Sequence, residues 1–229
     1  MGYGWRVNAP SSSSAAVREQ VAAASRKLAA AGLVIGSGGN VSARHGEFVA
    51  VTATGGELEQ LTAEEVTIVD LDGNVVEGDL APTSEIELHL GAYRRYDTGA
   101  VVHTHAPVAT ALACVLEDEL PCVHYQMLML GGAVPVAPYR TFGTPELAEA
   151  TLDALEGHMA VLMANHGTLT LGNDLAQAVS NSLLLEWAAT VYWRAASIGT
   201  PRALTEEERM AVINAAVTRS YGTLQAAEQ

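Results

Sequence analysis

Apolar residues recur at helical spacing along two long stretches of the chain. In the first stretch, Val17, Val21 and Leu28 fall on one side of a helix, and we predict this helix over residues 15–31. The second stretch, residues 174–198, is apolar on most of its circumference, which predicts a deeply buried helix. Shorter helices are predicted over 83–96, 107–115 and 144–155, and a last helix runs from a capping box at 205–208 to Tyr221.

Between these helices, short apolar runs bounded by turn residues predict strands. The predicted strands are residues 41–44 and 47–52 (a hairpin), 67–71 and 74–77 (a second hairpin), 100–104, 160–164 and 168–171. Because helices and strands alternate without an internal repeat or linker, we expect a single α/β domain. We expect a mostly antiparallel central sheet flanked by helices over residues 14–229, preceded by a polar N-terminal tail, residues 1–13.

The charge balance is strongly acidic. The chain carries 26 Asp and Glu against 12 Lys and Arg, a formal net charge of −14. Nucleic-acid binding needs a basic surface, so we do not expect nucleic acid as a partner. Lys27 is the only lysine and lies in the first predicted helix, which argues against catalysis through a lysine Schiff base.

Cysteine content and hydropathy bear on disulfide bonding, cellular location and oligomeric state. Cys114 and Cys122 are too few for a disulfide framework or a cysteine zinc site, and because both lie in apolar runs we predict two buried thiols. The sequence has no signal-peptide pattern and no apolar run long enough to span a bilayer, so we expect a cytoplasmic protein without a membrane partner. A hydrophobic content of 49% is high for a monomer of this size and favours an oligomer.

Three histidines lie at the ends of predicted strands. His103 and His105 follow the apolar run 100–102, and alternation along a strand places both on the same face. His166 follows another apolar strand. Three histidines and an open coordination position are typical of a catalytic zinc site, so we predict a metal centre there. Glu85 stands in the first turn of a predicted helix, where an acidic residue can equally serve to complement the helix dipole.

Six short motifs occur in an order that is typical of one known family. They are residues 39–44 (GNVSAR), 52–55 (TATG), 82–85 (PTSE), 102–106 (VHTHA), 137–144 (APYRTFGT) and 165–167 (NHG). Through them the chain resembles the class II aldolase and adducin family, and within it the sugar-phosphate aldolases, from Val17 to Tyr221. A single motif of this length is a weak signal, but six in order are specific.

The resemblance implies a role for each matching residue. His103, His105 and His166 would hold one zinc ion per subunit, with Glu85 as the fourth ligand in the resting site and as the acid/base during the reaction. Tyr125 and Tyr221 would donate or position a proton, and the family's homotetramer would bring Tyr125 to a neighbouring subunit's site. The residues implied for binding the substrate phosphate are Asn40, Thr54, Gly55, Thr83 and Ser84. No role is given to His45, His89 and His158.

Elementary chemistry supports the implied reaction. Breaking a carbon–carbon bond beside a carbonyl leaves an enediolate, whose negative charge must be stabilised by an electrophile. Because the chain lacks a usable lysine, a metal ion is the available Lewis acid, and Glu85 fits as the group that moves the proton. The predicted reaction is the reversible cleavage of a ketose 1-phosphate to dihydroxyacetone phosphate and an aldehyde. The best prediction for the pair is L-fuculose 1-phosphate and L-lactaldehyde.

Other activities of the same family stay open at this point. Residues 123–129 lack the Asp of the pentulose-phosphate epimerases, and Gln126 stands where the methylthioribulose-phosphate dehydratases have a Glu. A decarboxylase of a small hydroxy acid and an aldolase for another deoxy-ketose phosphate are further alternatives. A non-catalytic, adducin-like binding module is the alternative from another class. It predicts lost metal ligands, whereas all three histidines and Glu85 are present.

Overall fold

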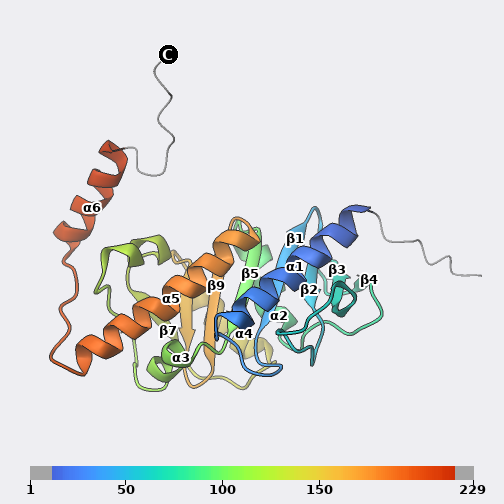
Figure 1. Ribbon diagram of the computed structural model, residues 1–229, viewed down its shortest axis with the longest axis horizontal. Coiled ribbons are helices and arrows are strands. Elements are labelled where there is room, and N and C mark those ends of the chain that lie inside the picture. The colour runs from blue at the N-terminus through green and yellow to red at the C-terminus, as the bar shows by residue number, and fades with distance from the viewer. Residues whose placement is uncertain (1–11, 220–229) are drawn as a thin grey trace, which may run out of the picture.

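The computed structural model describes residues 12–219 and is built on a central β-sheet (Figure 1). Within these residues, nine strands follow one another across the sheet in the order β4-β3-β2-β1-β5-β9-β8-β7-β6. Their bounds are β1 Asn40–His45, β2 Phe48–Thr52, β3 Val66–Val69, β4 Val75–Glu77, β5 Ala100–Thr104, β6 Glu119–Leu120, β7 Val134–Ala137, β8 Ala160–Met163 and β9 Gly167–Gly172. The described pairs are antiparallel except β7 with β8. The predicted α/β fold with a mostly antiparallel sheet is therefore confirmed.

Helices cover both faces of this sheet. One apolar core lies between the sheet and α1, α3 and α5, and a second lies between the sheet and α2 and α4. In Figure 1, α1 and α5 cross the front of the sheet. The helices span α1 Ser12–Ala30, α2 Ile86–Arg95, α3 Pro107–Ala113, α4 Pro145–Ala154, α5 Leu175–Ala196 and α6 Glu206–Thr218, with short 3-10 turns at η1 Ala63–Glu65 and η2 Tyr125–Leu130.

Strand β5 shows how two-sided burial positions the candidate site. Ala100 and Val102 belong to the core under α1, α3 and α5, whereas Val101 belongs to the core under α2 and α4. A strand buried on both faces reads as a continuous apolar run, which is the pattern seen in the sequence. Because side chains alternate along a strand, His103 is directed to the same side as Val101, toward α2.

The helix predicted over 83–96 begins later than expected. α2 starts at Ile86, and its N-cap position is held by Glu85, with no capping hydrogen bond from the Glu85 side chain among the described residues. Thr83 is therefore not the N-cap, although its hydroxyl accepts a hydrogen bond from the backbone N–H of Glu85 (3.3 Å). The backbone N–H of Thr83 donates to the carbonyl of Thr52 at the end of β2 (3.0 Å), which ties this segment to the sheet and holds Glu85 at the point where α2 begins.

The two ends of the chain differ from the sequence prediction in different ways. The predicted tail, residues 1–13, overlaps the structure at its end, where Ser12 already begins α1; residues 1–11 lie outside the described residues. The capping box at the start of α6 is confirmed, since Thr205 and Glu208 exchange the two expected hydrogen bonds. Tyr221 lies outside the described residues.

The prediction that residues 174–198 form a deeply buried helix is wrong for the last turns of α5. Residues as far as Ala189 are buried on the side that faces the sheet, but Trp187 on another side is 41% exposed and Trp193 is 52% exposed. α6 has no buried residue in the part of the chain that the structure describes. It stands away from the sheet in Figure 1. The reason is geometric: α5 is longer than the sheet surface that it covers, so its C-terminal turns continue past the core.

Two smaller predictions about the interior also need correction. Cys122 is buried as expected, but Cys114 is exposed because it caps the C-terminus of α3, where the chain turns away from the core. Strand β7 was not predicted, since Pro135 interrupts its apolar run and lacks the N–H that a central strand needs. Within the described residues, no helix is long and apolar enough to cross a membrane. The cytoplasmic location stays a prediction.

Candidate metal centre and active-site cavity

The three predicted histidine ligands meet at one edge of the sheet. His103 lies on β5, His105 follows its last residue, and His166 precedes β9. One nitrogen from each ring lies within 4.8 Å of the others, and the ring centroids are 4.9 to 5.2 Å apart. The antiparallel pairing of β5 with β9 brings these distant segments together, so the predicted clustering of the three histidines is confirmed.

Hydrogen bonding fixes which nitrogen of His103 faces the centre. The Nδ1 atom lies 2.8 Å from the backbone carbonyl oxygen of Thr168, so Nδ1 carries the hydrogen and donates it. The lone pair is then on Nε2, which lies 3.1 Å from Nε2 of His105. A backbone carbonyl holding the far nitrogen is the usual support of a metal-ligating histidine.

The turn that carries His166 leaves no space for a side chain beside the ligands. A Cβ atom added to Gly167 would lie 2.4 Å from the carbonyl oxygen of Thr104 and 2.8 Å from the ring of His105. Asn165 adopts a left-handed backbone conformation (φ 55°), which is uncommon for a residue other than glycine. The NHG motif is therefore explained by a tight turn that brings His166 back onto β5.

Glu85 completes the cluster from the start of α2. Its Oε2 atom lies 3.2 Å from Nε2 of His103, and its Oε1 atom lies 3.4 Å from Nε2 of His166. Asn40 donates a hydrogen bond from Nδ2 to Oε2 (3.0 Å). Oε1 is buried yet has no hydrogen-bond partner among the described residues. A buried carboxylate oxygen without a donor is costly unless a cation or a ligand satisfies it.

The donor set fits a divalent metal ion. Three imidazole nitrogens and one carboxylate oxygen converge, and zinc is bound by this kind of nitrogen and oxygen set, with three protein ligands and an exchangeable position in catalytic sites. The unpartnered Oε1 of Glu85 lies on the same side as the three rings. The residues present therefore fit the metal that the sequence predicts.

The protonation states at neutral pH suit metal binding. Burial, together with the charges of His103 and His166, lowers the pKa of His105 to about 4. Burial and the charge of His103 also lower the pKa of His166. Burial raises the pKa of Glu85, but the hydrogen bond and charge of His103 and the amide of Asn40 outweigh it, so that this pKa lies below its ordinary value. A neutral imidazole at His105 and His166 and an ionised carboxylate at Glu85 are the forms that bind a metal.

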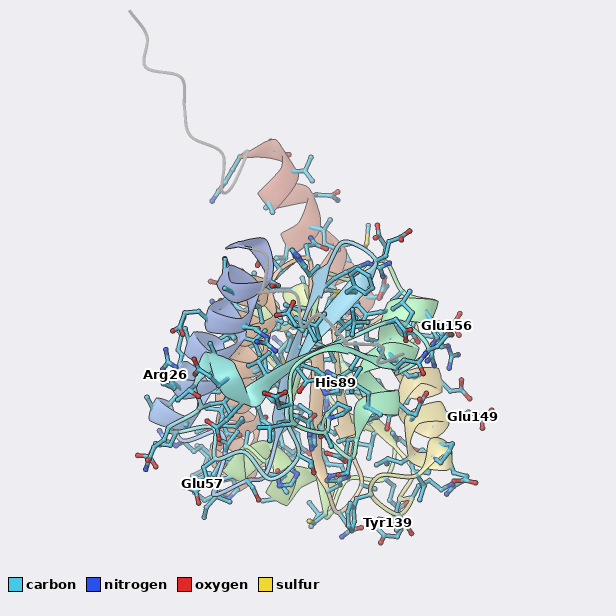
Figure 2. The ribbon with its side chains drawn as sticks, turned by 90° about the vertical axis from the view of Figure 1, so that its right-hand side faces the viewer. Arg26, Glu57, His89, Tyr139, Glu149 and Glu156 are labelled. Carbon is cyan, nitrogen blue, oxygen red and sulfur yellow. The ribbon has the colours of Figure 1, made fainter. Side chains whose placement is uncertain are left out.

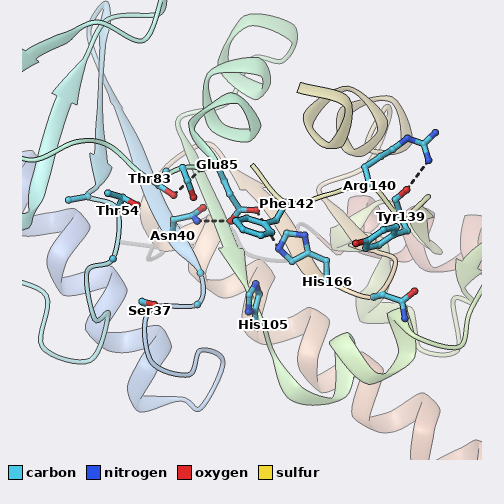
Figure 3. A pocket seen from close by; sticks show the side chains of 16 residues that line it. Ser37, Asn40, Thr54, Thr83, Glu85, His105, Tyr139, Arg140, Phe142 and His166 are labelled. Atoms are coloured by element: carbon cyan, nitrogen blue, oxygen red, sulfur yellow. Dashed lines mark hydrogen bonds and ion pairs between the residues drawn. The ribbon is translucent and has the colours of Figure 1, made fainter. Parts of the chain in front are cut away.

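A cavity of about 540 Å³ opens beside this cluster. All five residues that the sequence predicts for phosphate binding line it, together with Glu85, His105 and His166. Figure 3 shows Thr54 and Thr83 on one side, Glu85, Phe142 and His166 in the middle, and Tyr139 on the other side. The structure thus brings the predicted residues to one place. Their roles in phosphate binding stay predictions.

Sequence reasoning assigned no role to one loop that lines the cavity. Tyr139, Arg140 and Phe142 line it from the loop between β7 and α4. These residues belong to the APYRTFGT motif, which supported the family resemblance without a stated function. The sequence feature that could have pointed to them is the presence of two aromatic residues in a polar loop, where an apolar side chain has no core to enter. Phe142 and Tyr139 are 69% and 58% exposed.

Tyr125, one of the two predicted catalytic tyrosines, does not line the cavity of its own chain. It lies in η2 and is 53% exposed. Its ring stacks on that of His124 (centroids 4.5 Å apart), and His124 in turn contacts Trp187 of α5 (4.8 Å). The geometry therefore leaves Tyr125 on the surface, as expected for a residue that serves another subunit. Its catalytic role stays a prediction.

Comparison with known proteins identifies the family. The sequence profile described as "Class II Aldolase and Adducin N-terminal domain" matches residues 19–193. The chain belongs to the class II aldolase and adducin family. This confirms the predicted membership, and it makes the chain an enzyme of the class II aldolase type, because the curated relatives described next are aldolases.

Two curated relatives and one solved structure illustrate the similarity. A 5-deoxy-D-ribulose 1-phosphate aldolase of Bacillus thuringiensis serovar kurstaki is 41% identical over 83% of this chain and 91% of its own length. The L-fuculose phosphate aldolase of Escherichia coli is 37% identical over 80% of this chain and 85% of its own. A solved L-fuculose 1-phosphate aldolase superposes with a TM-score of 0.84 and 36% identity, covering 90% of this chain and 97% of that one.

Proposed function

We propose that this protein is a zinc-dependent aldolase that reversibly cleaves a ketose 1-phosphate to dihydroxyacetone phosphate and a short aldehyde. The observation that carries the proposal is the unpartnered, buried Oε1 of Glu85 among three imidazoles in the cavity wall. Lyase chemistry of this type needs both an electrophile for the carbonyl and a base at the neighbouring carbon. The cluster has the groups for both requirements.

His103, His105 and His166 would hold the zinc ion, with Glu85 as the fourth ligand before substrate binds. When bound, zinc supplies a Lewis acid that stabilises negative charge on the carbonyl and hydroxyl oxygens of the substrate. The chain's own share is to keep the imidazoles of His105 and His166 neutral, which burial favours by lowering their pKa. It also holds the ring of His103 in place through the carbonyl of Thr168.

Glu85 would act as the acid/base. In the condensation direction its carboxylate takes a proton from the hydroxymethyl carbon of dihydroxyacetone phosphate, and in the cleavage direction it returns that proton. Asn40 holds Oε2 through its amide, so Oε1 is the oxygen free to accept. A carboxylate held at one oxygen by a hydrogen bond, with no hydrogen bond at the other, is oriented for proton transfer.

The two sides of the cavity suit the two ends of such a substrate. Thr54, Gly55, Thr83 and Ser84 offer hydroxyl and backbone groups beside the first turn of α2, an arrangement that favours an anion such as phosphate. Tyr139 offers an aromatic surface on the other side, and Phe142 adds apolar surface between the two sides, which favours a methyl end. A deoxy-ketose 1-phosphate has both features.

Two deoxy sugars are therefore the leading substrates. The sequence predicted L-fuculose 1-phosphate, which yields L-lactaldehyde, and relatives named for this substrate support it. The relative that is 41% identical is named for 5-deoxy-D-ribulose 1-phosphate, which would yield acetaldehyde. The two substrates share the phosphate and the terminal methyl group and differ in the aldehyde that leaves.

Tyr125 and Tyr221 would donate or position the proton on the aldehyde oxygen from a neighbouring subunit of a homotetramer. The exposed aromatic cluster of Tyr125, His124 and Trp187 supports a contact with another chain, because aromatic residues are enriched at subunit interfaces.

The test is incubation of purified protein with each sugar phosphate, with dihydroxyacetone phosphate measured by a coupled dehydrogenase. We expect release of dihydroxyacetone phosphate from at least one of the two and about one zinc per chain by metal analysis. Carbon dioxide release, epimerised sugar or dehydrated product instead of dihydroxyacetone phosphate would assign the protein to one of the other family activities. No turnover of any substrate by the metal-loaded protein would favour the adducin-like binding module.

A further inference from the structure

A continuous chain of buried side chains runs behind the cavity and ends on Glu85. Tyr93 and Ser42 are joined by their hydroxyl groups (2.8 Å), and Ser42 lies 2.7 Å from Nδ1 of His89. Nε2 of His89 lies 2.6 Å from Oδ1 of Asn40, whose Nδ2 donates to Glu85. Figure 2 shows His89 in the interior of the molecule. His89 has no solvent exposure.

The direction of the hydrogen bonds from Glu85 to Ser42 follows from the charge of Glu85. An ionised Glu85 accepts only, so Asn40 must present its NH2 group to it and its carbonyl Oδ1 to His89. His89 must then donate from Nε2, which leaves Nδ1 as an acceptor from the hydroxyl of Ser42. Burial, reinforced by the charge of His103, lowers the pKa of His89 to about 3, so a neutral ring with one hydrogen agrees with this assignment.

The consequence concerns the amide of Asn40, which can adopt two orientations related by a flip. In the flipped orientation Oδ1 would face Oε2 of Glu85 at about the present 3.0 Å, two acceptors without a hydrogen between them. In the observed orientation one N–H of Asn40 binds Glu85 and the other is available to the cavity that Asn40 lines. His89 stabilises this orientation, because it supplies the only kind of partner that Oδ1 accepts, a donor.

We propose that His89 is a positioning residue, which locks the Asn40 amide in one orientation and thereby sets both the free oxygen of Glu85 and the donor that the cavity offers. The inference rests on the proposed function for its effect on turnover, but its structural part does not. His89 stands one helical turn after Glu85 on α2, so one helix carries both the acid/base and the residue that orients it through Asn40.

A pair of conservative variants separates this role from simple core packing. In H89Q the side-chain NH2 can replace the Nε2 donor toward Asn40. In H89N the shorter side chain reaches the Nδ1 position, where it meets Ser42 and leaves Asn40 without its donor. H89L removes both contacts. The matched control is N181L, which replaces an equally buried helical amide whose bond goes to the carbonyl of Leu171 (2.8 Å).

We expect H89Q to keep zinc affinity and kcat near those of the unmodified protein. H89N and H89L should lose zinc affinity, measured by competition with a chelator, by roughly 10- to 100-fold, a range typical for residues that support metal ligands. kcat should fall by a similar factor with a smaller change in KM. N181L should lower Tm without either change. Folded H89N and H89L proteins with unaltered zinc affinity and kcat would overturn the proposal, as would an H89Q protein no better than H89L.

The unmodified protein offers a test that does not depend on folding of a variant. Nitrogen-15 NMR of the histidine rings should report His89 as the neutral tautomer with hydrogen on Nε2 between about pH 5 and 8. Hydrogen on Nδ1 would reverse the direction of the two hydrogen bonds that His89 makes and would refute the proposal. Zinc affinity and the tautomer are measured without substrate. A failure of the proposed aldolase function would therefore appear as absent turnover, with the His89 results unaffected.

Discussion

The wall of the cavity, taken together with the buried side chains behind it, differs from the C-terminal arm, defined here as residues 190–218, in which side chains it exposes. In the wall, polar groups such as Ser42, His89 and Tyr93 are buried and each has a partner. In the arm, apolar side chains such as Trp193 and Val217 are exposed. Both regions come from sequence segments rich in apolar residues, so composition alone does not distinguish them.

The difference indicates which region is complete within one chain. Buried polar groups are tolerated only where their hydrogen bonds are satisfied, and the wall satisfies them with its own residues except at Oε1 of Glu85, which lies beside the three imidazoles of the candidate metal site. Exposed apolar surface is left where the chain itself has nothing to cover it. We therefore expect the metal centre to act within a subunit and the arm to act between subunits.

The largest effect is expected from E85Q, which acts inside the wall. The amide cannot take up the proton, so kcat for cleavage should fall by about 100- to 10,000-fold, the range of general acid–base catalysis. About one metal ion per chain should remain, held by the three histidines. Steady-state kinetics and metal analysis measure both. The control is E87Q, since Glu87 is exposed on the same helix and pairs with Arg94. Normal turnover in E85Q would remove Glu85 from proton transfer.

A smaller effect, of roughly 10- to 100-fold in kcat, is expected from Y125F if its hydroxyl assists proton transfer. Co-expression of E85Q and Y125F subunits tests whether Glu85 and Tyr125 of one site come from different subunits. If Tyr125 serves a neighbouring site, about a quarter of the sites in randomly mixed oligomers carry both intact groups, and activity exceeds that of either variant alone. Mixed oligomers with no more activity than their parents would place both groups in the same subunit. Y96F is the control, because Tyr96 donates to the carbonyl of Leu152 away from the cavity.

The smallest expected effect is on stability in acid. Burial and the charge of His103 lower the pKa of His89 to about 3 in the folded protein, whereas a histidine in the unfolded chain titrates near 6.5. The unfolded state therefore binds the proton first, and stability is lost as the pH falls below about 6.5.

At pH 5 this linkage amounts to about 2 kcal/mol. Denaturant unfolding of the metal-free protein at pH 7.5 and 5 should show a smaller loss in H89Q than in the unmodified protein. N181L, which retains His89, should lose as much as the unmodified protein. Equal losses in all three would mean that His89 does not contribute to acid sensitivity.

Much of this fold could be predicted from local patterns. β5 matches its prediction at both ends, because the apolar run 100–102 begins directly after Gly99 and favours a short buried strand. The capping boxes and turn residues likewise act over three or four positions. The errors occur where distant segments decide the outcome. Thr83 is held against β2 two residues before the N-cap of α2, and Cys114 turns outward at the end of α3.

The candidate site likewise contains residues that local motifs identify and residues whose role depends on distant contacts. The motifs identified the three histidines, Glu85 and the phosphate-side residues, because each motif encodes a local turn or strand end that the chemistry needs. They gave no role to His89, whose partners Ser42 and Asn40 are 47 and 49 residues distant in sequence. A helical histidine beside apolar neighbours carries no sign of such partners.

Residue identity alone supplies the functional groups of this protein: three imidazoles and a carboxylate that fit a metal ion, and no usable lysine. Folding does not change these groups. Folding sets how they are oriented and which surfaces are left uncovered. Hydrogen-bond direction and burial depend on contacts between segments far apart in the chain. The free oxygen of Glu85, the locked amide of Asn40 and the exposed arm beyond α5 are consequences of those contacts.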